Sequence, residues 1–155
     1  MEHKTTPVPS VLLVGITFII LTFVIISVWL NTLHRPDIQG TWKSMICEDG
    51  IKREMTLTPG TWNLTTHIFD TKSCLTEIRT EKTQGTYELG DKSKEVPGAT
   101  HAEFKIKPPQ NGCSTNFDLV KREDNLLYLG DQSESHCTRG EWPKKLNPFA
   151  LQKQN

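Results

Sequence analysis

The four cysteines are the residues whose chemistry the sequence indicates most clearly. Cys47, Cys74, Cys113 and Cys137 all follow the one strongly apolar segment of the chain, and their number is even. Widely spaced cysteines in a domain of this size are typical of disulfide bonds formed in an oxidising compartment. Paired cysteines cannot act as thiolate ligands, and neither C-x-x-C nor H-x-x-x-H occurs in the chain. The sequence therefore predicts two disulfides and no metal site.

No group of residues has the types and spacing that a catalytic site requires. Nucleophilic catalysis needs a nucleophile, a base and an orienting group, and glycoside hydrolysis needs two facing carboxylates. The five histidines are scattered along the chain, and there is no glycine-rich phosphate loop. Lys and Arg number 18, as do Asp and Glu, so the charge pattern does not point to nucleic acid. The sequence predicts a protein that is not an enzyme and needs no cofactor.

One apolar segment, residues 11–30, predicts a membrane anchor. It is twenty residues long and carries no charged side chain. As a helix it would span about 30 Å, which is the thickness of the hydrocarbon layer of a bilayer. A cleavable signal peptide is the alternative, but this segment is longer than the usual apolar core of such peptides, and no small-x-small cleavage site follows it. We therefore expect a retained transmembrane helix.

The anchor divides the rest of the chain. We expect residues 1–10 to be a cytosolic tail, 31–39 a short linker, 40–142 a folded domain and 143–155 a flexible carboxy-terminal tail. Because disulfides form outside the cytosol, the domain is expected on the extracellular, lumenal or periplasmic side of the membrane. The sequon that begins at Asn63 permits N-glycosylation in a eukaryotic host.

Alternation of apolar and polar residues predicts that the domain is mainly β. Runs of period two are separated by glycine, proline, aspartate and asparagine, which are typical of turns. The pattern predicts eight strands in a small antiparallel up-and-down barrel. The expected strands are residues 41–47, 52–58, 61–69, 75–81, 85–89, 100–107, 115–121 and 126–130.

The same strands predict how the cysteines pair. In an up-and-down barrel the connections alternate between the two ends. On the expected strands, Cys47 and Cys74 lie at one end, and Cys113 and Cys137 lie at the other. Four cysteines allow three pairings, and the pairing that needs no chain to cross the barrel is Cys47–Cys74 with Cys113–Cys137. Each bridge would contribute about 3 kcal/mol in the chain-entropy model.

An eight-stranded barrel is wide enough either to be filled by side chains or to hold one small ligand, and the sequence leaves both open. Arg53 is the charged residue at the expected inward positions. A buried guanidinium requires a partner, which would be an acidic ligand head group or a carboxylate such as Glu48 or Glu77. In a hollow barrel, the residues expected to line the ligand site are Arg53, Met55, Leu57, Thr66, Ile68, Ile78, Tyr87, Phe104 and Phe117.

The tripeptide Gly40-Thr41-Trp42, at the start of the first expected strand, resembles the lipocalin and calycin barrels. In those families this tryptophan closes one end of the barrel and stacks against an arginine that follows the last strand. The resemblance implies a structural pair of Trp42 and Arg139. The pair has a physical basis, because a guanidinium plane can cover the face of an indole ring.

A longer pattern resembles the extracellular domain of the adenomatosis-polyposis-coli-down-regulated Wnt inhibitors. It runs over residues 40–87 and consists of Gly40-x-Trp42-x-Ser44-x-x-Cys47-Glu48, then Arg53, Trp62, Asp70-x-x-x-Cys74 and Gly85-x-Tyr87. That family is built from membrane-tethered, β-barrel-like domains with lipid-binding cavities. The resemblance implies the same fold and a ligand of the same kind here.

Two functions follow as expectations. In the first, the membrane-anchored barrel binds a hydrophobic or lipid ligand, and apolar walls supply the affinity by burial at about 25 cal/mol per Å². In the second, the barrel is solid and the protein is an accessory or assembly subunit that docks on other subunits of a larger membrane complex. The small size of the chain, its short linker and its proline-containing tail favour the second function.

Overall fold

The computed structural model describes residues 19–26, 36–110, 112–131 and 136–154. The chain divides into two units, Met1–Arg35 and Pro36–Asn155.

In the first unit, residues 19–26 form a helix whose apolar side chains are exposed. Of the residues that the structure describes, none belongs to a helix that is both long and apolar enough to cross a bilayer. The predicted cytosolic tail, the remainder of the predicted membrane span and most of the predicted linker lie outside the described residues.

The second unit is a closed barrel of antiparallel strands in which each strand pairs with the next and the last pairs with the first. This confirms the predicted eight-stranded fold. The strands are β1 (Gly40–Ser44), β2 (Ile51–Thr58), β3 (Thr61–Phe69), β4 (Glu77–Lys92), β5 (Thr100–Gln110), β6 (Cys113–Glu123), β7 (Leu126–Leu129) and β8 (Leu151–Lys153).

Two of the eight strands differ from the prediction. β4 is one continuous strand where the sequence predicts two, at residues 75–81 and 85–89. The residues that join them are polar on both faces, which hides the alternation. β8 closes the barrel between β7 and β1, inside the segment 143–155 that the sequence predicts to be a free tail. The prediction that the domain ends at residue 142 is therefore wrong.

The fused β4 changes which end of the barrel each cysteine occupies. The connections β1–β2, β3–β4, β5–β6 and β7–β8 share one end, which we call the loop end; the other connections share the opposite end, which we call the plug end. The predicted disulfides, Cys47–Cys74 and Cys113–Cys137, are both confirmed. Both lie at the loop end, so the prediction that they staple opposite ends is wrong.

The plug end is filled by a compact hydrophobic core around Trp42, whose side chain is fully buried. The Trp42 Nε1 donates a hydrogen bond to the Ile38 carbonyl oxygen at 2.8 Å. The core consists of Ile38, Trp42, Met55, Leu57, Trp62, Tyr87, Ala102, Phe104, Val120, Leu127 and Leu151.

The cations that cover the Trp42 ring are not the predicted one. The Arg122 guanidinium lies 5.9 Å and the Lys153 Nζ 5.6 Å from the ring centroid. Arg139 instead lies on the surface, 3.8 Å from a Glu103 carboxylate oxygen, and the predicted Trp42–Arg139 pair is wrong. The cause is the position of the last strand. Because β8 comes after Arg139, the cation at the end of the closing strand is Lys153.

Candidate functional site at the loop end

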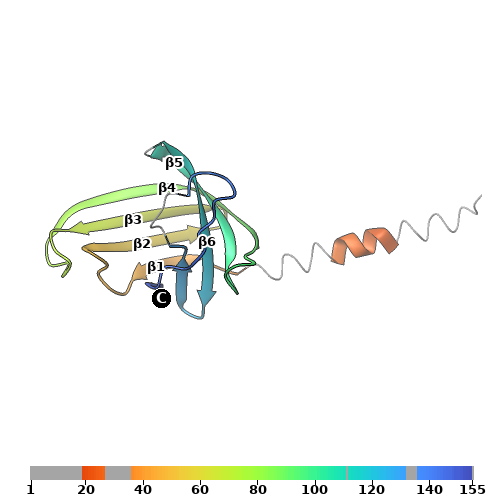
Figure 1. The fold of residues 1–155 in the computed structure, drawn as a ribbon, viewed down its shortest axis with the longest axis horizontal. Coiled ribbons are helices and arrows are strands. Elements are labelled where there is room, and N and C mark those ends of the chain that lie inside the picture. Colours follow the sequence, from red (N-terminus) through yellow and green to blue (C-terminus); the bar gives the residue numbers. More distant parts are fainter. Residues whose placement is uncertain (1–18, 27–35, 111, 132–135, 155) are drawn as a thin grey trace, which may run out of the picture. The chain divides into compact units, whose positions relative to one another are not determined.

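The barrel is only partly closed at the loop end, because β4 and β5 separate there. Their pairing runs from Lys92↔Thr100 to Gly85↔Ile106. Beyond that rung, residues 77–84 of β4 remain paired with β3, and within the described part of the chain no strand pairs with their other edge. Figure 1 shows the result: the tips of the β3–β4 and β5–β6 hairpins point in different directions.

Gly85 lies at the last pair before the two strands separate, with the backbone of β5 directly against it. A Cβ atom at this position would lie 1.7 Å from the Lys105 carbonyl oxygen. The Trp62 Nε1 donates to that oxygen at 3.3 Å and to the Thr86 carbonyl oxygen at 3.2 Å. Only a glycine allows this approach, because any side chain would push the strands apart.

The inner face of the sheet beyond this point is half-buried, and its Leu64 packs against the edge of the core. Its pairing register places Arg53 beside Thr66 on β2 and β3, and Leu64 beside Thr83 on β3 and β4. We call this group the loop-end inner face; its members, all partly exposed, are Arg53, Leu64, Thr66, Ile68 and Thr83. Apolar and hydroxyl side chains are mixed here with the Arg53 guanidinium. The register also places the exposed Arg79–Glu81 ion pair on this face, beside Ile68 and Thr66.

The guanidinium of Arg53 has a partner within the protein. Its Nη1 lies 3.1 Å from Glu48 Oε2, and the exposed fractions of the two side chains are 33% and 27%. The other carboxylate that the sequence suggests, Glu77, pairs instead with His67 at 3.1 Å. The Arg53 backbone N–H donates to the Ser44 hydroxyl at 2.8 Å, which ties β2 to the end of β1. A charged pair therefore lies beside the apolar part of the loop-end inner face.

Four of the residues predicted to line a ligand site lie deeper, in the packed core. Met55, Leu57, Tyr87 and Phe104 are buried among the side chains of the plug end. The rings of Tyr87 and Phe104 lie 5.9 Å apart. Burial, and secondarily the negative charge of Asp37, raises the pKa of the Tyr87 hydroxyl. These side chains fill the barrel rather than surround a space.

Two other predicted ligand residues face outward, and their predicted inward orientation is wrong. Ile78 is 64% exposed, because β4 is one continuous strand: the register places Thr83, Glu81 and Arg79 on the inner face, which leaves Ile78 on the outer one. Phe117 pairs with Glu103 on the outer face of the β5–β6 pair. It is covered there by Trp142, at 5.2 Å between ring centroids.

Alternation predicts that Phe117 faces inward on β6 and that its neighbour Asp118 faces outward. The structure shows the reverse, because the carboxylate of Asp118 is buried on the inner face. Asp118 is 3% exposed and pairs with the inward Ala102. Its Oδ1 accepts hydrogen bonds from the backbone N–H groups of Leu119 and Gly130, at 2.7 and 2.8 Å. These bonds compensate for the burial of its charge. Alternation alone would assign such a residue to the outside.

Sequence reasoning also missed Leu64 and Thr83 as members of the site. Leu64 is not among the residues expected to line a ligand site, although it alternates with Thr66 on the expected strand 61–69. Thr83 falls in the gap between two expected strands. Treating residues 77–89 as one strand of period two would have placed Thr83 on the inner face. In the described part of the chain, no three His, Cys, Asp or Glu side chains are grouped so that they could hold a metal ion.

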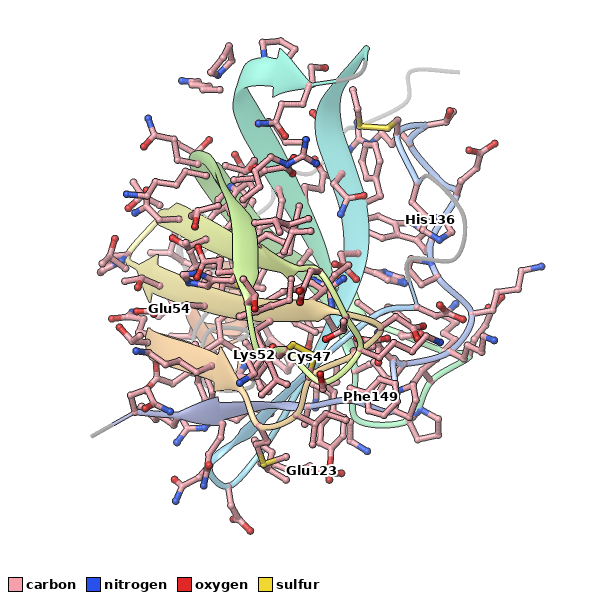
Figure 2. The ribbon with its side chains drawn as sticks, turned by 90° about the vertical axis from the view of Figure 1, so that its left-hand side faces the viewer. Cys47, Lys52, Glu54, Glu123, His136 and Phe149 are labelled. Atoms are coloured by element: carbon pink, nitrogen blue, oxygen red, sulfur yellow. A yellow bond between two sulfur atoms is a disulfide. The ribbon has the colours of Figure 1, made fainter. Side chains whose placement is uncertain are left out.

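The loop-end inner face offers two kinds of group for binding. The half-exposed apolar strip can accept an apolar group, and the Arg53–Glu48 pair and the threonine hydroxyls can orient a polar one. Figure 2 shows Cys47 on the connection that follows β1. The segment with His136 lies on the opposite side of β6 from β2 and β3. The disulfide at Cys47 thus staples the loops next to this face.

The comparison with known protein families agrees with this architecture. The profile of the family described as adenomatosis polyposis coli down-regulated 1 matches residues 28–116, which is more than half of the chain. The match includes β1 to β5 and the start of β6, and with them the whole loop-end inner face. No curated protein matches the chain. On the strength of the family match, the chain belongs to the adenomatosis polyposis coli down-regulated 1 family.

Proposed function

We propose that this barrel binds an amphipathic lipid at its loop end, with the apolar part of the lipid against the loop-end inner face. The observation that carries the proposal is the separation of β4 from β5 beyond Gly85 and Ile106, which leaves Leu64 and Ile68 partly exposed inside the barrel. Exposed apolar side chains on an inner face gain free energy when a ligand covers them, about 25 cal/mol per Å². No covalent chemistry is involved.

The packed plug end limits how far such a ligand can enter. Three core rings lie below the loop-end inner face, where Phe104 contacts both Trp62 and Tyr87. They support the floor of the site, so the ligand would lie across the opening rather than along the barrel axis. An acidic head group could use the remaining N–H donors of Arg53 but would also meet the Glu48 carboxylate, whereas a neutral or zwitterionic head group could use both charges of the pair.

We further infer that residues 11–30 anchor the barrel to a membrane, with the barrel on the side where disulfides form. The helix at residues 19–26 supports this inference, because it presents large apolar side chains such as Phe23, which is 72% exposed. Such a surface is stable in lipid and unfavourable in water. The exposed Asn63 on β3 would be open to glycosylation in a eukaryotic host.

A pair of neighbouring substitutions tests the lipid site. Thr66→Trp places an indole on the loop-end inner face, and we expect it to reduce retention of lipid by about tenfold through steric exclusion. Thr65→Trp places the same ring on the outer face of the same strand and should leave retention unchanged. The full-length protein is expressed in a host that does not glycosylate it and is extracted in mild detergent. Native mass spectrometry then measures the fraction of the protein that retains a lipid.

The proposal fails if the unmodified protein retains neither a copurified lipid nor added lysophospholipid under these conditions, or if the two variants lose the lipid equally.

A third variant, Arg53→Ala, tests where the lipid head group binds. Weaker binding of an acidic lipid in this variant, with unchanged binding of a neutral one, would place the head group at Arg53. Equal binding of both lipids would remove Arg53 from the site.

A second candidate function is docking on other subunits of a membrane complex. It is favoured by the large apolar side chains next to the Cys47–Cys74 disulfide: Ile46 is 47% exposed and Leu75 is 83% exposed. Surfaces of this kind commonly mark interaction sites. Affinity capture of the full-length protein in mild detergent would identify stable partners, and Leu75→Glu should release any partner that binds this surface.

A further inference from the structure

A second concave site lies outside the barrel, away from the loop-end inner face. It is a pocket of about 740 Å³ between the β4–β5 connection and the segment that crosses the outer face of β5 and β6. We call it the outer pocket. Its lining comes from residues 91–95 on one side, His101 beneath, and His136 with residues 140–144 on the other side. Its volume falls in the range of small-molecule sites, roughly 300–1,000 Å³.

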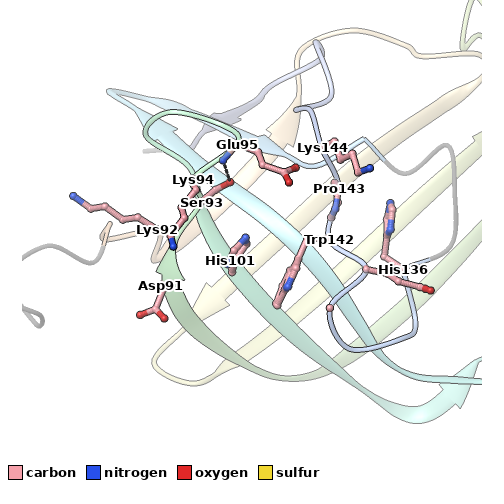
Figure 3. A pocket seen from close by; sticks show the side chains of 12 residues that line it. Asp91, Lys92, Ser93, Lys94, Glu95, His101, His136, Trp142, Pro143 and Lys144 are labelled. Atoms are coloured by element: carbon pink, nitrogen blue, oxygen red, sulfur yellow. Dashed lines mark hydrogen bonds between the residues drawn. The ribbon is translucent and has the colours of Figure 1, made fainter.

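The floor of the outer pocket is aromatic. The rings of His101 and Trp142 stack with centroids 4.3 Å apart and an angle of 21° between their planes. Both are half-buried, and Phe117 supports the indole from its edge at 5.2 Å. Figure 3 shows the two rings side by side between the two walls of the pocket. Because the two rings cover each other's inner faces, a ligand can stack only on an outer face of the pair. The floor is contributed by segments that only the fold brings together.

The walls of the outer pocket carry charges of both signs. Three lysines (Lys92, Lys94, Lys144) and three acidic residues (Asp91, Glu95, Glu141) line it, so their charges sum to zero. All six residues are exposed. None of the six forms an ion pair with any residue that the structure describes. The walls therefore offer ammonium donors and carboxylate acceptors that are not already bound to each other.

This combination restricts the chemical class of the ligand. A multiply charged anion would meet three carboxylates, and a multiply charged cation would meet three ammonium groups. A purely apolar molecule would strip water from the charged walls without replacing it. A sugar suits both parts of the site, because each hydroxyl both donates and accepts a hydrogen bond and the C–H face of the ring packs on an aromatic ring.

We propose that the outer pocket is a binding site for a short neutral saccharide, such as the end of a glycan chain. The saccharide ring lies on the His101–Trp142 floor, and its hydroxyls reach the lysine and acidic side chains of the two walls. This function is separate from the lipid site, since the two sites share no residue. Together they would let one domain engage a lipid and a glycan at the same time.

Saturation-transfer NMR on the full-length protein tests the proposal, with chitobiose, cellobiose and lactose as probes. The detergent should have no sugar head group, because such a head group would compete. Trp142→Ala removes half of the floor and should weaken binding by about tenfold or more. Lys144→Gln changes an exposed wall residue and should weaken it by about 3- to 10-fold. Lys82→Gln, on β4 and outside the pocket, is the matched control and should have no effect.

Three results would overturn the proposal. The first is that none of the three disaccharides gives a signal at about 10 mM, which corresponds to no useful affinity. The second is that Lys144→Gln binds as well as the unmodified protein while remaining folded by circular dichroism, a result that does not depend on whether Trp142→Ala folds. The third is that a disaccharide containing a uronic acid binds more than about tenfold more tightly than its neutral counterpart, since the site would then select anions.

Discussion

The plug end and the loop end of the barrel are made from the same strands, yet they differ in how completely those strands meet. At the plug end, β4 and β5 are paired and Trp42 is buried under two cations. At the loop end the two strands diverge, the inner face is half-exposed, and two disulfides hold the connecting loops. The packed core thus lies at the plug end, and the face proposed to bind lipid lies at the opposite end. Packing secures the fold at one end, and covalent bonds replace packing where the barrel opens.

The largest expected effect distinguishes the two ends directly. Trp42→Ala removes a fully buried indole from the plug end, and we expect it to lower the free energy of unfolding by about 3–5 kcal/mol. Ile46→Ala, in the loop after β1, removes an apolar side chain that is already 47% exposed and should change stability by less than about 0.5 kcal/mol. Urea titrations followed by tryptophan fluorescence and circular dichroism would measure both. Similar losses would contradict the assignment of stability to the plug end.

The next largest effect concerns the disulfides. The paired replacement of Cys47 and Cys74 by Ser should cost about 3 kcal/mol, because the bridge closes a loop across a sequence separation of 27 residues. Hydrogen exchange should accelerate mainly in the β1–β2 and β3–β4 connections. If the amides of the plug end become less protected to the same degree, the two ends are one cooperative unit and the comparison does not hold.

A smaller effect is expected at the point where the two ends meet. Gly85→Ala forces the new Cβ against the Lys105 carbonyl oxygen, which would lie at 1.7 Å, and should cost about 1–3 kcal/mol as the strands shift apart. Gly90→Ala is the matched control on the same strand, because its Cβ would meet nothing closer than 3.6 Å. Thermal unfolding of the two variants would measure both losses of stability. A loss in Gly85→Ala that is no larger than in Gly90→Ala would show that the close contact at the Gly85–Ile106 pair is not required.

The smallest effect is electrostatic and lies in the paired part of β4 and β5. Lys105 Nζ is 2.7 Å from Glu88 Oε1, and the hydrogen bond and charge of this lysine hold the pKa of Glu88 below its ordinary value of 4.5. The pair therefore contributes stability that is fully present above pH 4.5 and lost as the pH falls through the lower pKa of the folded state. The side chains are on the surface, so the contribution is small.

Carbon-13 NMR of the Glu88 carboxyl group would measure this pKa. In Lys105→Met the pKa should rise towards 4.5, whereas in Lys82→Met it should stay low. A Glu88 that already titrates at its ordinary value in the unmodified protein would show that this cross-strand pair does not form in solution.

The amino-acid sequence alone determined the class of fold and its covalent framework. Period-two alternation separated by turn residues indicates an antiparallel barrel, and the even number of cysteines indicates two disulfides. The predicted pairing is confirmed, although the expected placement of the two bridges at opposite ends is wrong. Trp42, Met55 and Leu57 were assigned to the interior because their strands alternate without interruption. These features are local, or depend only on the order of elements along the chain, so a sequence contains them in full.

Tertiary structure decided which way several side chains point and where the barrel opens. Ile78 faces outward because two expected strands are one continuous β4, in which alternation from the inward Thr83 places Ile78 on the outer face. Phe117 faces outward because Asp118 finds backbone donors inside the barrel. β8 forms because a three-residue segment meets two open edges at once. The loop-end inner face and the outer pocket depend on contacts between distant segments, and the pattern of a single strand does not contain that information.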